Sequence, residues 1–274
     1  MQQQTIIITG ASDGIGAAAA RQLSAKGEQV VLVGRSPAKT AALAAALHAP
    51  SYVADFADLA QVRTLAAQLL VAYPRIDVLA NNAGGIMGNR ELTADGFEKT
   101  FQVNHLAPFL LTSLLLPTLI ASSAKVLQTS SIAARLFGHL AIEDLQNEKH
   151  YSPNKAYGDA KLANILFTRE LHRRYHAQGL SAAAFHPGNV ATNFASDTTS
   201  LLRFVYRTPL KRLLLITPEK SGATLTWLAE GTPGTTWQSG DYYEKNRPAR
   251  TNKQADDTEL ARELWERSAA MLSL

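Results

Sequence analysis

The chain has 274 residues, 46% of them hydrophobic and 18% charged, which allows a large core, excludes an intrinsically disordered chain and favours one α/β domain over two. There is no cysteine, so disulfides, thiolate metal sites and cysteine nucleophiles are excluded. The net charge of +4 and the pI of about 9.3 come without any nucleic-acid-binding motif, so we expect no nucleic-acid partner.

Short apolar runs alternate with helical patterns along the whole chain, which is typical of a parallel sheet with helices on both faces. Strands are expected at 5–9, 29–33, 51–54, 76–80, 125–130, 180–185 and 240–243. Helices are expected near 95–120, 154–177 and 256–272, with another beginning near Pro218. No repeat or linker divides the chain, so we expect a doubly wound Rossmann fold in one domain over residues 1–274.

The first expected strand, Thr5–Thr9, runs into a glycine-rich turn and then an alanine-rich helix. Glycines allow a close approach to a pyrophosphate, and the helix N-terminus offers free N–H groups. The spacing Gly-x3-Gly-x-Gly differs from the general dinucleotide fingerprint, so an ordinary glycine-rich turn is the alternative. The residues of this turn expected to contact a cofactor are Gly10, Ser12, Asp13, Gly14, Ile15 and Gly16.

The second strand ends at Gly34-Arg35, about 20 residues after the glycine turn, where NAD-binding proteins carry an acidic residue that contacts the ribose. Gly34 opens space, and the guanidinium of Arg35 suits a 2′-phosphate. The alternative is a solvated arginine at a strand end. Asp13 argues against NADP(H), because it adds a negative charge near the phosphates, although it could cap the following helix. We expect NADP(H) to be preferred, with NAD(H) possible.

Tyr157 and Lys161 stand four residues apart in a helical run, on one face of the helix. A lysine ammonium beside a phenol lowers the tyrosine pKa from about 10 towards neutrality, which makes a proton donor for a carbonyl or an acceptor for an alcohol. Tyr151 and Lys155 share this spacing, but Pro153 suits the first turn of a helix and leaves Tyr151 outside it. The sequence therefore predicts Tyr157 and Lys161 as the catalytic pair.

Taken together, these residues resemble the short-chain dehydrogenase/reductases, and most closely their retinol-dehydrogenase-like branch. The motifs that carry the resemblance are Thr9-Gly10-x3-Gly14-x-Gly16, Asn81-Asn82-Ala83-Gly84, Asn104, Ser130-Ser131, Tyr157-x3-Lys161 and Pro187-Gly188. The resemblance implies an enzyme that interconverts an alcohol and an aldehyde or ketone. An inactive dinucleotide sensor or scaffold on the same fold is the competing class, and the complete catalytic set argues against it.

The resemblance also implies a role for each catalytic candidate. Tyr157 would protonate the carbonyl oxygen, Ser131 would hold that oxygen, and Lys161 would lower the tyrosine pKa and bind the nicotinamide ribose. Asn104 falls within a long expected helix, where asparagine has poor propensity. Its role would be a kink or a water site that relays protons to Lys161, and an exposed polar residue is the alternative.

Further cofactor contacts are implied at the ends of three other strands. Asp55 would accept the adenine amino group, or simply cap a turn. The segment after the sixth strand would cover the nicotinamide, with Val190 near the carboxamide and Thr192 near the phosphates. The expected contacts at these three places are Asp55, Phe56, Asn82, Ala83, Gly84, Pro187, Gly188, Val190 and Thr192.

Two segments are expected to shape the substrate site. An insertion at roughly His139 to Tyr151 is expected to line the substrate mouth. Residues 193–217 interleave leucines with basic residues and are interpreted as a lid over an apolar carbonyl or alcohol substrate. A membrane-surface helix is the alternative, disfavoured because four basic residues around Pro209 make a weak anchor.

The sequence also bears on location and assembly. The chain has no run of 18 apolar residues, and its first strand begins almost at Met1. We therefore expect no membrane span, no stable membrane anchor, no signal peptide and a cytoplasmic location. The histidines show no metal-ligand spacing, so no metal is expected, and a homo-oligomer is left open.

Overall fold

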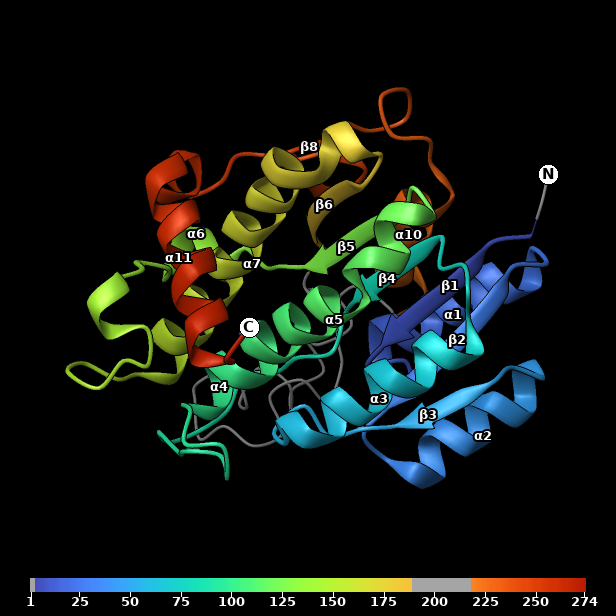
Figure 1. Cartoon of the computed structure of the whole chain (residues 1–274), viewed down its shortest axis with the longest axis horizontal. Coiled ribbons are helices and arrows are strands. Elements are labelled where there is room, and N and C mark those ends of the chain that lie inside the picture. The colour runs from blue at the N-terminus through green and yellow to red at the C-terminus, as the bar shows by residue number, and fades with distance from the viewer. Residues whose placement is uncertain (1–2, 189–217) are drawn as a thin grey trace, which may run out of the picture.

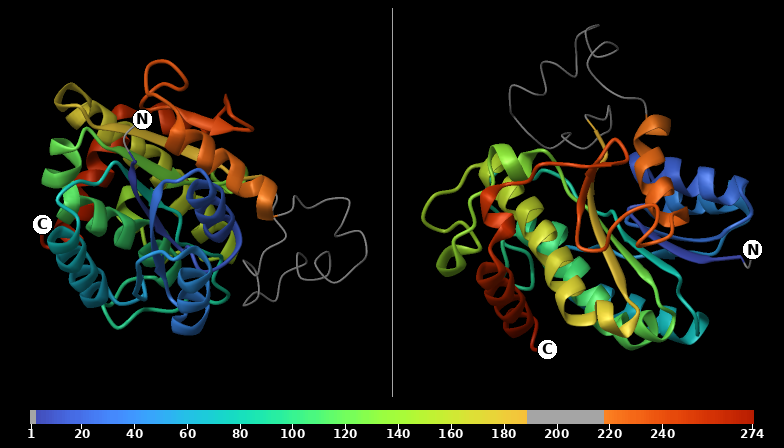
Figure 2. Two further views of the ribbon diagram at one scale, coloured as in Figure 1. Left: turned by 90° about the vertical axis from the view of Figure 1, so that its right-hand side faces the viewer. Right: turned by 90° about the horizontal axis from the view of Figure 1, so that it is seen from above.

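A twisted sheet forms the centre of the protein, and helices cover both of its faces (Figures 1 and 2). The structure is a computed structural model that describes residues 3–188 and 218–274. The strands are β1 Thr5–Thr9, β2 Gln29–Gly34, β3 Ser51–Val53, β4 Val78–Asn81, β5 Lys125–Thr129, β6 Ser181–His186, β7 Tyr242–Glu244 and β8 Arg247–Pro248. Their order in the sheet is β3-β2-β1-β4-β5-β6-β7-β8, and all neighbours are parallel except β7 and β8.

The helices occupy the connections between these strands and the C-terminal end of the chain. They are α1 Gly14–Ala25, α2 Pro37–Leu47, α3 Leu59–Ala72, α4 Lys99–Phe101, α5 Ala107–Ala121, α6 Ala133–Leu136, α7 Pro153–Tyr175, α10 Pro218–Glu230 and α11 Thr258–Met271. A π-helical turn, η1 Gln102–Leu106, joins α4 to α5, and the 3₁₀ turns are η2 Ile142–Asp144, η3 His176–Gln178 and η5 Lys253–Asp256.

The apolar run in β1 serves two separate cores. Ile6, Ile7 and Ile8 are all fully buried, and alternate side chains of a strand point to opposite faces of the sheet. Ile7 packs into the core formed with α3, α5, α7 and α11, whereas Ile6 and Ile8 pack into the core formed with α1, α2 and α10. This double burial explains why the strand reads as a continuous apolar run rather than as an alternating one.

Helix starts follow local capping signals. The Ser36 hydroxyl accepts from the Lys39 N–H at the start of α2, and Pro37 occupies the first turn. Ser152 and Pro153 do the same for α7. Tyr151 therefore lies outside α7, as the sequence predicts.

The predicted fold class is confirmed, since all seven expected strands are present with ends within two residues. The prediction missed β8, a two-residue antiparallel strand that contains Pro248 and is too short to give a sequence signal. The helix expected at 95–120 was wrong at its start. The buried carboxylate of Glu98 accepts from the N–H groups of Thr100 and Phe101, so the helix begins only at Lys99.

Among the described residues, one helical stretch, Lys99–Ala121, is long and apolar enough to cross a membrane, with a mean hydropathy of 1.5. It packs within the fold, where 61% of its most apolar window is buried. Most of α5 contributes to the core beside α3, which accounts for its composition.

Candidate active site

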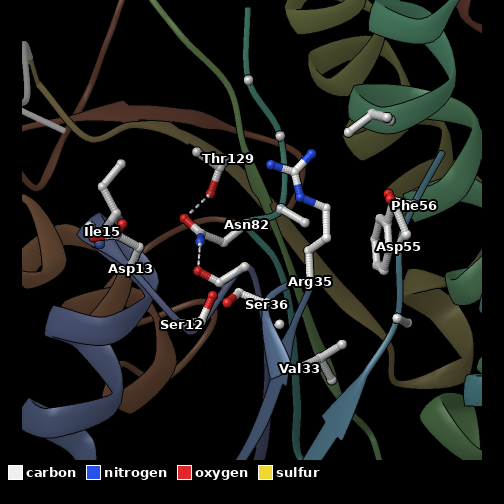
Figure 3. Close-up of a pocket in the computed structure, with 18 of the residues that line it drawn as sticks. Ser12, Asp13, Ile15, Val33, Arg35, Ser36, Asp55, Phe56, Asn82 and Thr129 are labelled. Atoms are coloured by element: carbon white, nitrogen blue, oxygen red, sulfur yellow. Dashed lines mark hydrogen bonds between the residues drawn. The ribbon is translucent and has the colours of Figure 1, made fainter. Parts of the chain in front are cut away.

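The carboxyl ends of β1, β2, β3, β4 and β5 surround a cavity of about 480 Å³ (Figure 3). The chain reverses its direction across the sheet between β1 and β4, and in open α/β sheets ligands bind at this switch point. Twelve of the predicted site residues line the cavity: Gly10, Ser12, Asp13, Gly14, Ile15, Arg35, Asp55, Phe56, Asn82, Ala83, Gly84 and Lys161. The structure thus brings together residues from five separate stretches of the chain.

The glycine turn after β1 packs directly against the loop after β4. Gly10 has a φ of +64°, and a Cβ there would lie 2.9 Å from the Ala83 Cα. A Cβ on Gly16 would lie 2.4 Å from the Gly10 carbonyl oxygen. Gly16 does not line the cavity, so its glycine allows the turn to fold tightly beneath the cavity.

Asn82 joins the ends of three strands. Its Nδ2 donates to the Thr9 carbonyl at 3.0 Å. Its Oδ1 accepts from the Thr129 hydroxyl at 3.2 Å (Figure 3). The Thr9 hydroxyl accepts in turn from the N–H groups of Asn82 and Ala83. The Asn82 side chain therefore links the ends of the strands that line the cavity. Thr129 also lines the cavity, and the sequence prediction missed it.

A pair of cations stands at the end of β2. In Figure 3 the Arg35 side chain rises into the cavity, between the glycine turn and Phe56. Lys39, in the first turn of α2, also lines the cavity, and its Nζ lies 2.7 Å from the Asp13 carboxylate. This ion pair neutralises the Asp13 charge that counted against NADP(H), while Asp13 also caps α1 through the Gly14 N–H.

Two details of the sequence prediction change at this end of the cavity. Lys39 was missed, although a lysine in the first turn of the helix that follows Arg35 could have been recognised. The space expected at Gly34 is filled by protein, since a Cβ there would lie 2.2 Å from the Thr40 hydroxyl and 2.9 Å from the Ser12 Cβ. Gly34 therefore allows β2, α2 and the glycine turn to pack together.

Asp55 and Phe56 line the opposite side of the cavity (Figure 3). One carboxylate oxygen of Asp55 accepts from the Ala57 N–H at 2.9 Å, so the predicted turn-capping role is present. Contact with an adenine stays a prediction.

Tyr157 and Lys161 lie on one face of α7 and are both buried, at 4% and 1% exposure. The Lys161 ammonium lies 5.4 Å from the centre of the Tyr157 ring and donates to the Thr129 carbonyl at 3.1 Å. Burial lowers the pKa of Lys161 to about 7. The Ser130 hydroxyl donates to the Lys161 carbonyl at 2.7 Å, which fixes this turn of α7 against the end of β5.

The rival pair is engaged elsewhere. The Tyr151 hydroxyl donates to the Gly88 carbonyl at 3.0 Å, and the Lys155 ammonium pairs with the Asp159 carboxylate at 2.5 Å. The same Asp159 carboxylate accepts from the His139 N–H at 2.7 Å. These contacts anchor both ends of the 139–151 insertion.

Asn104 lies in the π-helical turn η1 and is fully buried, so the exposed-residue alternative is wrong. Its Nδ2 donates to the carbonyls of Gly85 and Thr100, and its Oδ1 accepts from the Gly85 N–H. A Cβ on Gly84 would lie 2.4 Å from the Asn104 Oδ1 and 3.1 Å from the Lys161 Nζ. Gly84, Asn104 and Lys161 therefore converge at one point. A role for Asn104 in ordering water stays a prediction.

Ser131 follows β5 and leads into α6, and its hydroxyl accepts from the Ala133 N–H at 3.2 Å. It does not line the large cavity but a neighbouring one of about 10 Å³, with Arg135 and Tyr242. Its substrate contact stays a prediction.

The remaining predicted contacts lie at or beyond the end of β6. Pro187 and Gly188 follow this strand and are half-buried. Val190, Thr192 and the lid at 193–217 lie outside the described residues. In the part of the chain that the structure describes, no group of three or more potential metal ligands occurs.

Comparisons with known proteins place this geometry in a family. Residues 4–201 match the family model described as short chain dehydrogenase. The chain is 40% identical to the Streptomyces sp. (strain C5) protein named "Putative daunorubicin C-13 ketoreductase", covering 97% of this chain and 92% of that protein. It is 35% identical to retinol dehydrogenase 13 of Homo sapiens, covering 99% and 85%.

A solved structure agrees along almost the whole chain. The crystal structure of an uncharacterised protein from Mycobacterium paratuberculosis superposes with a TM-score of 0.77 at 33% identity, covering 99% of this chain and 94% of that one. The strand order, the glycine turn and these relatives lead to one conclusion. The protein is an oxidoreductase of the short-chain dehydrogenase/reductase family, in its retinol-dehydrogenase-like branch.

Proposed function

We propose that the protein is an NADP(H)-dependent oxidoreductase that interconverts an apolar alcohol and its aldehyde or ketone. The observation that carries this proposal is the buried pair of Tyr157 and Lys161, held beside Gly84 and Asn104 at the switch point of the sheet. An inactive sensor would need the cavity but would not need a buried, paired phenol and ammonium.

The residues of the cavity fit a dinucleotide. Its volume of about 480 Å³ lies in the range of small-molecule sites. The N-terminus of α1 opens onto it through the glycine turn, where no side chain at Gly10 blocks the approach of a pyrophosphate. The hydride would be supplied or accepted by the nicotinamide.

The positive charges at the end of β2 support NADP(H) over NAD(H). Arg35 and Lys39 both line the cavity, where NAD-binding proteins carry a carboxylate. A guanidinium and an ammonium suit a phosphate dianion, and the Asp13 charge is already paired with Lys39.

The chain's own groups would manage the proton. As negative charge grows on a carbonyl oxygen, the Tyr157 hydroxyl donates its proton to that oxygen. The ammonium of Lys161 stabilises the phenolate that remains, because the two groups are buried together. For an alcohol, Tyr157 accepts the proton instead. Ser131 would hold the substrate oxygen from the end of β5.

An apolar substrate agrees with the surface beside Ser131. Leu136 and Phe137 are 58% and 47% exposed at the end of α6. The names of the relatives cited above, a daunorubicin C-13 ketoreductase and a retinol dehydrogenase, refer to the reaction of a ketone and of an alcohol. We propose that α6 forms part of the wall that such a substrate contacts.

The test is a panel of aldehydes, ketones, steroids and retinoids, assayed by consumption of NADPH and repeated with NADH. Turnover that falls by roughly 10²–10⁴-fold in Tyr157→Phe supports the proposal. If NADPH binds tightly but no compound of the panel is reduced or oxidised, the sensor class is correct instead.

A further inference from the structure

A buried histidine lies one residue from Asn104 and has no role in the proposed chemistry. His105 belongs to the π-helical turn η1 and is 1% exposed. Its ring lies among the rings of Phe101, Phe109 and Phe167, with centroids 5.1, 6.0 and 6.1 Å away. A polar ring in such an apolar cluster is costly unless its nitrogens find partners.

One ring nitrogen is tied to the C-terminal helix. The His105 Nε2 lies 2.9 Å from the hydroxyl of Ser268 in α11, which is itself fully buried. The two residues are 163 positions apart. Since α11 packs along α7 (Figure 1), this contact joins the end of the chain to the turn beside the candidate catalytic residues.

The other neighbour of His105 is α7, where the ring of Phe167, one turn after Asn164, has its centroid 6.1 Å from that of His105. The His105 Nδ1 and the Asn164 Oδ1 are both buried, and neither has a conventional hydrogen-bond partner in the described part of the chain. Burial lowers the pKa of His105 to about 4, and the Asn164 side chain opposes this, as a nearby acceptor would. A neutral ring protonated on Nδ1 would match donor to acceptor and leave Nε2 to accept from Ser268.

Asn164 in turn shares an acceptor with Lys161. The Asn164 Nδ2 donates to the Thr129 carbonyl at 3.2 Å, and the Lys161 ammonium donates to the same oxygen at 3.1 Å. A flipped Asn164 amide would place its oxygen against the Thr129 oxygen and repel it. A contact that fixes the orientation of the Asn164 amide therefore also fixes the Thr129 carbonyl, which is an acceptor of the Lys161 ammonium.

We propose that His105 is a positioning residue for Lys161: held by Ser268 as a neutral ring, it orients the Asn164 amide, which steadies the Thr129 carbonyl that the ammonium contacts. This inference rests on the proposed role of Lys161. Among the described residues, Tyr157 is the titratable group in contact with Lys161, and burial is the cause of the lowered pKa of this lysine. Its charge therefore depends on the neutral acceptors around it.

The test measures how carbonyl reduction by NADPH falls as the pH rises. The ammonium is lost as the pH rises through the pKa of Lys161, and a misplaced acceptor lowers that pKa. In His105→Phe, which suits the aromatic cluster, we expect the fall in kcat/KM to move to lower pH by about 0.5–1 unit. Asn164→Leu should shift the fall in kcat/KM to lower pH by at least as much. The double variant should show no larger shift than Asn164→Leu alone.

Thr168→Val is the matched control. Thr168 is fully buried one turn after Asn164 and donates to the Asn164 carbonyl, outside the proposed chain of contacts. Its variant should lower the melting temperature and leave the pH profile in place. The proposal would be wrong if His105→Phe lowered the melting temperature and left the pH profile in place. It would also be wrong if the pH shifts of His105→Phe and Asn164→Leu added up in the double variant.

A second readout needs no catalysis. Heteronuclear NMR of the histidine ring nitrogens in the unchanged protein should show His105 neutral and protonated on Nδ1 at pH 6 and above, with the tautomer mixed in Ser268→Ala. A ring protonated on Nε2, or one that charges near its ordinary pKa, would overturn the proposal. If the protein reduced no carbonyl at all, the proposed function would fail while this readout still decided the tautomer.

Discussion

Lys39→Ala tests whether the cations at the end of β2 recognise the 2′-phosphate of NADPH. The side chain of Lys39 is 54% exposed and that of Asp13 is 52% exposed, so their ion pair contributes little to folding, about 0–1 kcal/mol. The variant should keep its melting temperature. It should bind NADPH about fivefold more weakly, because it removes a half-exposed cation worth about 1 kcal/mol and leaves the Asp13 charge unpaired.

Companion variants separate these two effects. Asp13→Asn keeps an N-cap for α1 and removes the negative charge, so Asp13→Asn with Lys39→Ala should recover part of the lost affinity. Arg35→Ala should weaken NADPH by about 1.5–3 kcal/mol, or roughly ten- to a hundredfold. Each variant should change NADH affinity little, since NADH lacks that phosphate.

The assay is a titration of each variant with NADPH and NADH at one fixed ionic strength. Lys26→Ala is the matched control, because Lys26 is equally exposed and pairs with Glu230 at the same 2.7 Å, but lies at the C-terminal end of α1. Equal losses for NADPH and NADH in Arg35→Ala and Lys39→Ala would refute the phosphate-recognition role and restore the solvated-arginine alternative.

Three further predictions concern the chemistry and the substrate. Tyr157→Phe should leave NADPH affinity nearly intact and lower turnover by at least roughly 10²–10⁴-fold, whereas Tyr151→Phe should matter far less; an essential Tyr151 would reverse the choice of pair. Gly84→Ala should lower both cofactor affinity and turnover, because a Cβ would press on the Asn104 and Lys161 side chains; wild-type kinetics would contradict the convergence of these groups. Changing Phe204 and Tyr206 to Ser should raise KM for bulky apolar carbonyls without altering NADPH binding, if residues 193–217 form a lid. Loss of binding to anionic vesicles with unchanged kinetics would favour the membrane-surface alternative.

The catalytic pair shows how far local sequence signals reach. Tyr157 and Lys161 could be predicted because helical periodicity places residues four apart on one face, and because Ser152 and Pro153 mark where the helix begins. Likewise the run of isoleucines in β1 and the glycines after it predicted a buried strand and a phosphate-binding turn.

Local sequence signals failed where the backbone geometry depends on contacts with residues distant in the chain. The poor helix propensity of Asn104 indicated an irregular position, but it did not predict a π-helical turn, where this side chain bonds to Gly85 and Thr100. The helix start expected at 95 was misplaced, because the capping carboxylate of Glu98 is buried against other elements.

By itself, the sequence determined the order of strands and helices, the glycine turn and the pairing of Tyr157 with Lys161, since each of these depends on residues within a few positions of one another. Only the tertiary structure decided that Lys39 neutralises Asp13 and that His105 meets Ser268. The two pairs are separated by 26 and 163 positions along the chain. Their contacts exist because packing brings the ends of the strands to one edge of the sheet and lays α11 along α7. A local sequence pattern cannot predict contacts between residues so far apart in the chain.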